Sequence, residues 1–398
     1  MAKILFICNY YPNNYSGGSA INCFNYIQSV SRNNELFLYS IRDHESQGKK
    51  SDLQSLNIKV FDSTYLQTNK PNFFNFFSFK TTNQFKYKKL QQEVENLIKK
   101  IDPDIIKVYG EFSMNSLNYF NPKIVYHLIF GDPFHKVIML RWRYNIFYNF
   151  KLKNIISYIG YTLHVIKEII YFFHNLKGLD KKYDTLFYFG LQHKKTWIKL
   201  FKSKIKLLGS PIHRFNLGDE KLRLNKNKII IIGKLGQIEN LYAQHFFVRK
   251  LFPHLLKLKD NYEINFIGNK EGLIKPLKIL SEKYPNKIKI RGFVNDINKE
   301  WKEAKILLVP TVTNLGVRTR IYSAFSLGCA VVCHVSSKSG IPELKNNFNC
   351  LIGNNAKEIA ELLEKLLKDK KLRNKLINGG KQTLLNILQK TDGVVQQS

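Results

Sequence analysis

Short apolar runs alternate with amphipathic segments along the whole chain. The run Lys3–Cys8 is followed by a loop rich in Asn, Tyr, Pro, Ser and Gly over residues 9–18, and then by apolar residues at helical spacing over Ser19–Ser31. A short apolar run predicts a buried strand, and apolar residues three or four positions apart predict a helix. The start of the chain therefore predicts a strand, a glycine-containing loop and a helix.

The same alternation continues to the end of the chain. In the first half the pattern predicts a helix near Phe85–Ile101 and strands at Leu36–Ser40, Ile58–Phe61, Ile105–Tyr109, Ile124–Phe130 and Thr185–Phe189. In the second half it predicts strands at Lys228–Ile232, Tyr262–Ile267, Lys287–Arg291, Ile306–Val309, Ala330–His334 and Cys350–Ile352, and helices at Ala243–Leu258, Leu273–Tyr284, Ile297–Ala304, Arg320–Ser326 and Ala356–Leu367. Strands that alternate with helices indicate parallel, doubly wound sheets.

The pattern restarts in the middle of the chain. A Gly209-Ser210-Pro211 turn and a charged stretch precede the apolar run that begins at Lys228. A chain of 398 residues is also too long for one ordinary core. We therefore expect an α/β protein with two Rossmann-like domains, residues 1–215 and residues 216–398.

The segment from Gly316 to Ala330 carries the most informative chemistry. A glycine turn with Arg318 and Arg320 opens a predicted helix, which is followed by a buried strand. Backbone N–H groups at a helix start attract anions, and arginine can bind a phosphate with two N–H groups. The segment fits a diphosphate site. It also fits an ordinary loop, helix and strand whose arginines are solvated.

Several other motifs occur in a recognisable order. They are Gly17-Gly18 after the first strand, Gly233-Lys234-Leu235 with Glu239-Asn240, Gly268 at a strand end, Gly292-Phe293-Val294 with Asp296, Val309-Pro310, and Gly340-Ile341-Pro342-Glu343-Leu344 with Asn349. Together with the arginine segment, this order resembles the GT-B glycosyltransferases, and the GT4-like group (glycosyltransferase group 1) in particular. The resemblance covers most of the second half and the first strand, loop and helix.

The resemblance implies the GT-B architecture, with two Rossmann-like domains facing a cleft. It implies that domain 216–398 binds a nucleoside diphosphate sugar and that domain 1–215 is the acceptor side. The residues implied in donor binding are Gly17, Gly18, Gly233, Lys234, Asn240, Phe293, Val294, Gly316, Val317 and Ser323, with Arg318 and Arg320 acting in catalysis. The activity implied is that of a retaining, metal-independent hexosyltransferase that needs no cofactor, because fixed cations can stabilise a departing diphosphate.

Two positions depart from the family pattern. Many GT4 enzymes carry two glutamates eight positions apart around this loop, and these positions are Leu315 and Ser323 here. A serine can make one hydrogen bond to a ribose but cannot bind both hydroxyls as a carboxylate does. The departure leaves open an alternative, a non-catalytic GT-B protein that binds a nucleotide, a glycan or a partner.

Asp132 and His135 are the candidate catalytic residues of the first half. Both follow the predicted strand that ends at Phe130, where the GT4 group usually has a histidine. Parallel sheets bind ligands at the carboxyl ends of their strands. His127 lies within the strand, and we expect it to be a core residue.

Residues 136–182 form a basic, aromatic insertion. Nine Lys and Arg face only Glu168 and Asp180, and the aromatic residues include Trp142, Phe147 and Phe172. Such a segment suits an anionic membrane surface, with cations on lipid phosphates. It also suits a pair of helices whose aromatic face is core. Nucleic acid is not expected, because no RNA- or DNA-binding signature accompanies the charge.

Charge and cysteine content add the expected location and process. The net charge of +33 points to anionic partners, although much of it follows from a Lys-, Asn- and Ile-rich composition. The five cysteines form no CxxC pair, and no signal-peptide pattern precedes the first strand. We therefore expect a cytoplasmic protein, peripheral on the inner face of the cell membrane, that transfers sugar to a saccharide or lipid-linked acceptor in envelope or surface polysaccharide synthesis.

Overall fold

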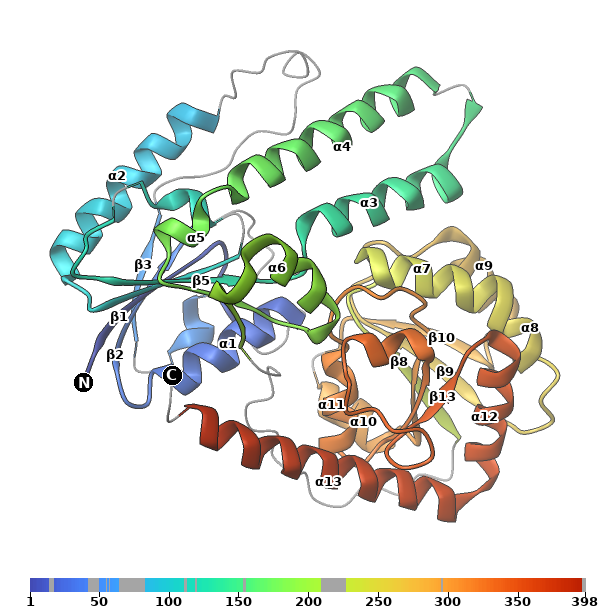
Figure 1. The fold of residues 1–398 in the computed structure, drawn as a ribbon. Coiled ribbons are helices and arrows are strands. Elements are labelled where there is room, and N and C mark those ends of the chain that lie inside the picture. The colour runs from blue at the N-terminus through green and yellow to red at the C-terminus, as the bar shows by residue number, and fades with distance from the viewer. Residues whose placement is uncertain are drawn as a thin grey trace. The chain divides into compact units, whose positions relative to one another are not determined.

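The chain folds into two compact units, Met1–Pro211 and Ile212–Ser398 (Figure 1). The computed structural model describes residues 1–13, 18–41, 50–54, 56, 58–63, 83–110, 113–118, 120–152, 155–208, 227–294 and 296–395. The domain boundary expected near residue 215 falls within residues 209–226, outside the described residues. Each unit is an α/β sandwich around one parallel sheet.

The sheet of unit 1 has seven parallel strands in the order β3-β2-β1-β4-β5-β6-β7. The strands are β1 (Lys3–Cys8), β2 (Glu35–Ser40), β3 (Lys59–Asp62), β4 (Ile105–Tyr109), β5 (Val125–Phe130), β6 (Thr185–Tyr188) and β7 (Ile205–Leu207). Most positions of β1, β2 and β4 are buried, as expected for central strands covered on both faces.

Helices cover both faces of this sheet. They are α1 (Gly18–Val30), α2 (Asn83–Ile101), α3 (Phe134–Tyr144), α4 (Ile155–Leu176), α5 (Leu179–Lys182) and α6 (Lys194–Phe201). Apolar residues of α1, including Cys23 and Ile27, pack on one face. The other face is covered by α2, the end of α4 and α6, through residues such as Val94, Phe172 and Trp197. α3 and α4 run side by side beyond the sheet (Figure 1).

The sheet of unit 2 has six parallel strands in the order β10-β9-β8-β11-β12-β13. The strands are β8 (Lys228–Ile232), β9 (Glu263–Ile267), β10 (Ile288–Gly292), β11 (Ile306–Val309), β12 (Ala330–His334) and β13 (Leu351–Gly353). Lys228 opens the central strand, and its ammonium group lies 2.6 Å from a carboxylate oxygen of Glu300 and 2.8 Å from one of Glu303. This pairing allows a lysine to lie inside the sandwich.

Seven α-helices are described in unit 2. They are α7 (Ile238–Phe246), α8 (Phe252–Leu255), α9 (Lys275–Lys283), α10 (Ile297–Glu303), α11 (Thr319–Ser326), α12 (Ala356–Lys368) and α13 (Lys370–Val395). Asp296 caps α10 by accepting hydrogen bonds from the N–H groups of Asn298 and Lys299. Asn355 caps α12 by accepting from Glu358 N–H. α8, α9 and α12 contribute to the core on one face of the sheet, and α10 and α11 to the core on the other.

The expected fold class is confirmed. Every predicted strand is present, with its ends within one residue of the prediction, and Ile306–Val309 and Ala330–His334 agree at both ends. Both sheets are parallel with helices on both faces. The alternation of apolar runs with amphipathic segments was therefore sufficient to identify the two sandwiches.

Several elements differ from the prediction or were missed, and α6 at Lys194–Phe201 is one of those that were missed. The helix expected at Ala243–Leu258 begins earlier, at Ile238, and a π-helical turn at Phe247–Leu251 separates α7 from α8. Apolar residues continue at helical spacing through Phe247–Leu251, so the sequence pattern does not reveal that the helix is interrupted there. β7 was not predicted, because two of its three residues are exposed. α13 was also not predicted, because its sequence is mainly polar.

Candidate functional site

The candidate site of unit 2 lies where β8 and β11 are neighbours in the sheet. The strand order passes outward from β8 through β9 to β10 on one side, and from β11 through β12 to β13 on the other. The connections after β8 and β11 therefore leave in opposite directions. Ligands of open α/β sheets bind beyond the carboxyl ends of strands at such a switch point.

Arg320 links the ends of these two strands. Its Nη1 group donates to the backbone carbonyl of Ile232, 2.7 Å away at the end of β8. Its Nη2 group donates to the hydroxyl oxygen of Thr311, 2.9 Å away just after β11. The side chain is anchored at both strands, which fixes a guanidinium group at the switch point.

Asn240 and Lys234 belong to the same cluster. Asn240 accepts from Arg320 Nη1 at 3.2 Å and donates to the backbone carbonyl of Lys234 at 2.9 Å. Among the described residues, the Lys234 ammonium group makes no hydrogen bond or ion pair. A small cavity at this place is lined by Gly233, Asn240, Arg320 and Pro310, among others. The structure thus brings Gly233, Lys234, Asn240 and Arg320 together.

Gly233 and Gly268 let the ends of β8 and β9 approach closely. A Cβ atom on Gly268 would lie 1.9 Å from the carbonyl oxygen of Gly233, and the φ angle of Gly268 is +145°. A Cβ atom on Gly233 would lie 2.5 Å from Nη1 of Arg320. No larger residue fits either position without displacing the backbone or the arginine.

Arg318 holds the loop between β11 and α11 together. Its Nη1 group donates to the carbonyls of Leu315 and Gly316, and its Nη2 group to the carbonyl of Thr313 at 2.9 Å. The residue is only 7% exposed. The sequence analysis expected the Nη groups of Arg318 to bind a phosphate. In this structure they bind carbonyls of the loop, so Arg318 shapes the loop.

Burial also affects the charge of the site. Burial, reinforced by the charge of Arg318, lowers the pKa of Arg320 to about 9. Arg320 therefore remains cationic at neutral pH and lacks the full hydration that would screen it. The alternative of solvated arginines is wrong, because Arg318 is buried and Arg320 is bonded within the protein.

The remaining predicted donor residues of unit 2 lie after β10, in the loop between β11 and α11, and on α11. Phe293, just after β10, is 71% exposed, and Val294 and Val317 are partly buried against the core. Gly316 has a φ angle of +77°, and Ser323 lies partly exposed on α11. Leu315 is buried, so the positions that carry glutamates in many GT4 enzymes hold a core residue and a hydroxyl.

Asp132 of unit 1 lies beside a residue that the sequence analysis missed. Nε2 of His193 is 2.7 Å from Oδ1 of Asp132, and the two residues follow β5 and β6. His135 does not join them in a hydrogen bond. Its ring lies 5.3 Å from that of Phe172 and 5.1 Å from that of Phe173, and burial lowers its pKa to about 4. His135 is therefore neutral at pH 7.

Three residues of these sites could not be found from the sequence. They are Thr311, His193 and Gln244, which donates from Nε2 to the carbonyls of Leu235 and Gly272. Each is a single polar residue without a motif, and the sheet order alone brings it to the site. Of the two predicted glycines in unit 1, Gly18 begins α1 and Gly17 lies outside the described residues.

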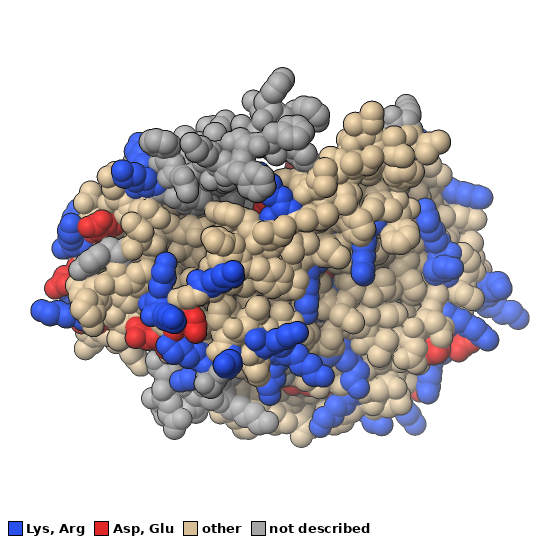
Figure 2. Space-filling model, turned by 45° about the horizontal axis from the view of Figure 1, so that its top comes forward, with Lys and Arg blue, Asp and Glu red and all other residues tan. Residues whose placement is uncertain are grey.

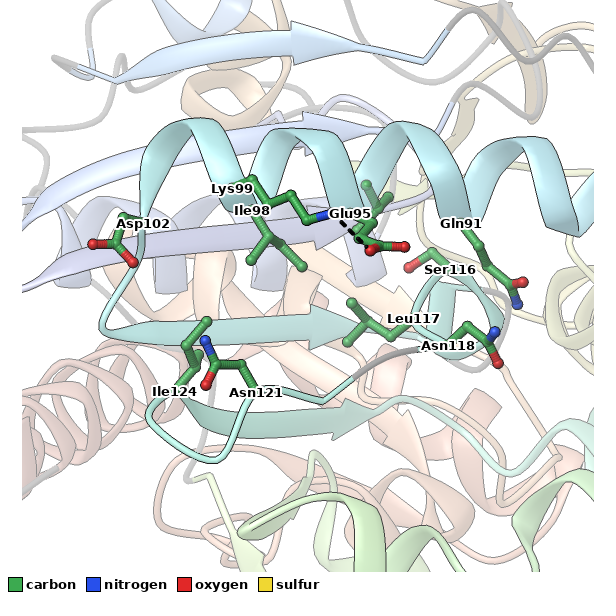
Figure 3. A pocket seen from close by; sticks show the side chains of 11 residues that line it. Gln91, Glu95, Ile98, Lys99, Asp102, Ser116, Leu117, Asn118, Asn121 and Ile124 are labelled. Atoms are coloured by element: carbon green, nitrogen blue, oxygen red, sulfur yellow. Dashed lines mark ion pairs between the residues drawn. The ribbon is translucent and has the colours of Figure 1, made fainter.

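A separate groove of about 350 Å³ runs beside α2 in unit 1. Gln91, Ile98 and Leu117 line it, and an ion pair of 3.0 Å joins Lys99 to Glu95 within it (Figure 3). None of the predicted site residues lines this groove.

Among the described residues, there is no cluster of His, Cys, Asp and Glu arranged to hold a metal ion. No helix in the described part of the chain is long and apolar enough to cross a bilayer.

The comparison with protein families matches the part of the chain that carries the unit 2 site. Residues 226–369 match the family described as glycosyl transferases group 1. Most of unit 2 is therefore a domain of the group 1 glycosyltransferase type. The matched range includes Gly233, Lys234, Arg318 and Arg320. The family match confirms the resemblance found in the sequence and favours the catalytic over the non-catalytic alternative.

Solved structures confirm the GT-B fold over the length of this chain. A glycosyltransferase from Rickettsia africae is 13% identical, with 100% of this chain and 98% of that chain covered and a TM-score of 0.64. HepE from Anabaena, solved with UDP and glucose, is 13% identical, with both chains fully covered and a TM-score of 0.63. WaaG, which is involved in lipopolysaccharide biosynthesis, is 12% identical, with coverages of 99% and 100% and a TM-score of 0.61. No curated protein is significantly similar in sequence.

Proposed function

We propose that this glycosyltransferase moves a hexose from a nucleoside diphosphate sugar to a hydroxyl of a saccharide or lipid-linked acceptor. The observation that carries the proposal is the position of Arg320, which joins the ends of β8 and β11 at the switch point of unit 2. We assign donor binding to unit 2 and the acceptor to unit 1, the domains that the sequence predicts at residues 216–398 and 1–215.

The proposed chemistry is electrostatic stabilisation of the departing diphosphate. Lys234 supplies an ammonium group that is not neutralised by a described partner, and Arg320 supplies a fixed guanidinium group. The N–H groups at the start of α11 add a partial positive charge. Preorganised cations of this kind stabilise charge that develops on a leaving group. On this basis we propose a transfer that needs neither a metal ion nor a cofactor.

The remaining predicted residues complete the proposal. Gly233, Gly316 and Val317, with the loop held by Arg318, are proposed to lie against the diphosphate, and the sequence resemblance proposes the same role for Gly17 and Gly18. Phe293 and Val294 lie against the base, and Ser323 makes one hydrogen bond to the ribose. Asp132 and His135 are the proposed catalytic groups of unit 1. Retention of the anomeric configuration is proposed from the GT4 resemblance alone.

Known structures guide the choice of donor and process. HepE was solved with UDP, with UDP-glucose, and with UDP and glucose, so a UDP-sugar is the first donor to test. WaaG is involved in lipopolysaccharide biosynthesis, and WaaB is a lipopolysaccharide outer core galactosyltransferase. We therefore propose a role in envelope or surface polysaccharide synthesis. The location proposed with it is the cytoplasm, with peripheral binding to an anionic surface on the inner face of the membrane.

The proposal is tested by incubating the purified full-length protein with a panel of UDP-, GDP- and ADP-sugars. We expect slow release of the nucleoside diphosphate from one class of donor, and faster release when a matching saccharide acceptor is added. Lys234→Gln should reduce this release strongly, whereas Lys302→Gln makes the same charge change at an exposed position on α10 and should not. Release from no donor, or equal loss in both variants, would contradict the proposal.

A further inference from the structure

One side of α4 carries a row of exposed aliphatic side chains. The row consists of Ile156, Ile159, Leu163, Ile166 and Ile170, each between 49% and 81% exposed. Their spacing of three, four, three and four positions keeps them in line along one side of a helix. Single exposed aliphatic residues are ordinary in soluble proteins, but a continuous row of this length marks an interaction surface.

The opposite side of α4 is already packed. Val165, Phe172 and Leu176 are buried, and the last two belong to the core of unit 1. Trp142 on α3 donates from Nε1 to the hydroxyl of Thr162 on α4 at 2.9 Å. These contacts fix the rotation of the helix, so the aliphatic row cannot turn inward without breaking them.

The exposed apolar surface continues around the connection between α3 and α4. Phe147, Phe150 and Leu152 are exposed there. Figure 2 shows a face rich in Lys and Arg, with a ridge near its upper right edge that is largely free of charged side chains. α3 and α4 project in this direction in Figure 1. The Phe150 ring lies 4.9 Å from that of Tyr158 in the first turn of α4, so the exposed residues of the connection adjoin the start of the aliphatic row.

The charges around this surface are mostly positive. Exposed basic residues near the two ends of the α3–α4 pair are Arg141, Arg143, Lys151, Lys177, Lys181 and Lys182. The acidic residue of α4, Glu168, lies two positions from both Ile166 and Ile170, which places it on the opposite side of the helix at about 100° per residue. Basic residues thus lie near the aliphatic row, whereas Glu168 lies on the opposite side of α4.

We propose that the aliphatic row of α4 docks this protein on an anionic membrane surface. α4 lies in the plane of the interface, with the row among the outer acyl chain segments and the neighbouring Lys and Arg on lipid phosphates. The inference deepens the peripheral location proposed above by naming the surface responsible. It does not require that sugar transfer occurs.

A second copy of this chain fits the same surface less well. Pairing two α4 rows would bring the basic ends of two α3–α4 pairs together, in a chain whose net charge is +33. Like charges opposed at an interface are unfavourable, whereas anionic lipid supplies the opposite charge. Charge complementarity therefore favours the membrane.

The experiment measures sedimentation of the full-length protein with vesicles of phosphatidylcholine alone, or of phosphatidylcholine mixed with phosphatidylglycerol. We expect binding only to the mixed vesicles. The combined variant Ile156→Gln, Ile159→Gln and Leu163→Gln should bind them about tenfold more weakly or worse, because three aliphatic insertions are lost. These side chains are exposed, so the variant should keep its thermal midpoint.

The matched control replaces exposed aliphatic residues elsewhere, in the combined variant Ile198→Gln, Ile279→Gln and Leu385→Gln. It should bind the mixed vesicles like the wild type. Equal binding of wild type and the α4 variant, equal binding to both vesicle types, or no binding would overturn the proposal. A wild-type dimer that the α4 variant abolishes would assign the row to a second copy instead. Nucleotide release, measured on the same samples, reports separately on the proposed transfer.

Discussion

Nε2 of His193 lies 2.7 Å from Oδ1 of Asp132 and so connects the ends of two adjacent strands of unit 1. His193 is only 1% exposed, whereas Asp132 is partly exposed. A carboxylate only accepts hydrogen bonds, so Nε2 of His193 carries the proton. The buried histidine therefore orients an accessible carboxylate at the carboxyl edge of the sheet.

Asp132→Asn should lower the turnover number about a hundredfold while leaving nucleotide affinity unchanged, because it removes the charge of a proposed catalytic group outside the donor-binding unit. Steady-state kinetics and calorimetry with the nucleoside diphosphate measure the two quantities. Asp102→Asn is the control, an exposed aspartate before β4. An unchanged turnover number, or an equal loss in the control, would remove Asp132 from the catalytic groups.

The sequence predicted the unit 2 cluster better than the unit 1 pair. Gly233, Lys234 and Arg320 lie in motifs that combine glycines with fixed cations at strand and helix ends, and this combination by itself indicates an anion site. His193 is a single histidine more than 60 positions from Asp132. Only the pairing of β5 with β6 brings it there, and sequence periodicity does not reveal strand order.

Sequence analysis also could not predict which way a side chain points. Arg318 and Arg320 are two positions apart and looked equivalent as phosphate ligands. In the structure Arg318 bonds to carbonyls of its own loop, while Arg320 reaches Ile232 in another strand. The aliphatic row of α4 was missed for a related reason, because sequence spacing shows that a stripe exists but not whether it faces the core.

We expect Gly268→Ala to destabilise unit 2 by about 1–3 kcal/mol, because the new methyl group would overlap the carbonyl of Gly233. Gly160→Ala is the matched control. No atom lies within 4 Å of a Cβ placed there, and alanine is the better helix former. Denaturant unfolding should show a lower midpoint for Gly268→Ala and an equal or higher one for the control. An unchanged midpoint for Gly268→Ala would show that the two strand ends are less closely packed than described.

Stability should fall as the pH is lowered from about 6.5 toward about 4. Burial, reinforced by Lys107, lowers the pKa of His127 to about 4, and burial lowers the pKa values of His135 and His245 to about 4 as well. Each group has a higher pKa when unfolded, about 6.5, so the unfolded state binds more protons in this window. The contribution of the three neutral histidines to the free energy of unfolding is complete above pH 6.5 and is lost as the pH falls to about 4.

Denaturant midpoints measured across this pH range check the prediction. His127→Phe should reduce the loss at low pH, because one of the three groups no longer titrates and the aromatic contact with Phe187 can be kept. The exposed His174→Phe variant serves as the control and should lose stability like the wild type. A pH dependence of His127→Phe identical to that of the wild type would show that His127 does not contribute.

The central claim, that the switch point of unit 2 binds a nucleoside diphosphate, is tested most directly by calorimetric titration of the full-length protein with UDP, GDP and ADP. We predict that one of them binds and that Lys234→Gln and Arg320→Gln each weaken binding by about 1.5–3 kcal/mol, the usual contribution of a hydrogen bond to a charged group. Arg249→Gln, an equal charge change at an exposed position, should bind like the wild type. The Lys234 side chain makes no hydrogen bond or ion pair among the described residues. Lys234→Gln should therefore fold normally even if Arg320→Gln does not. Wild-type protein that binds none of the three, or variants with unchanged affinity, would contradict the account.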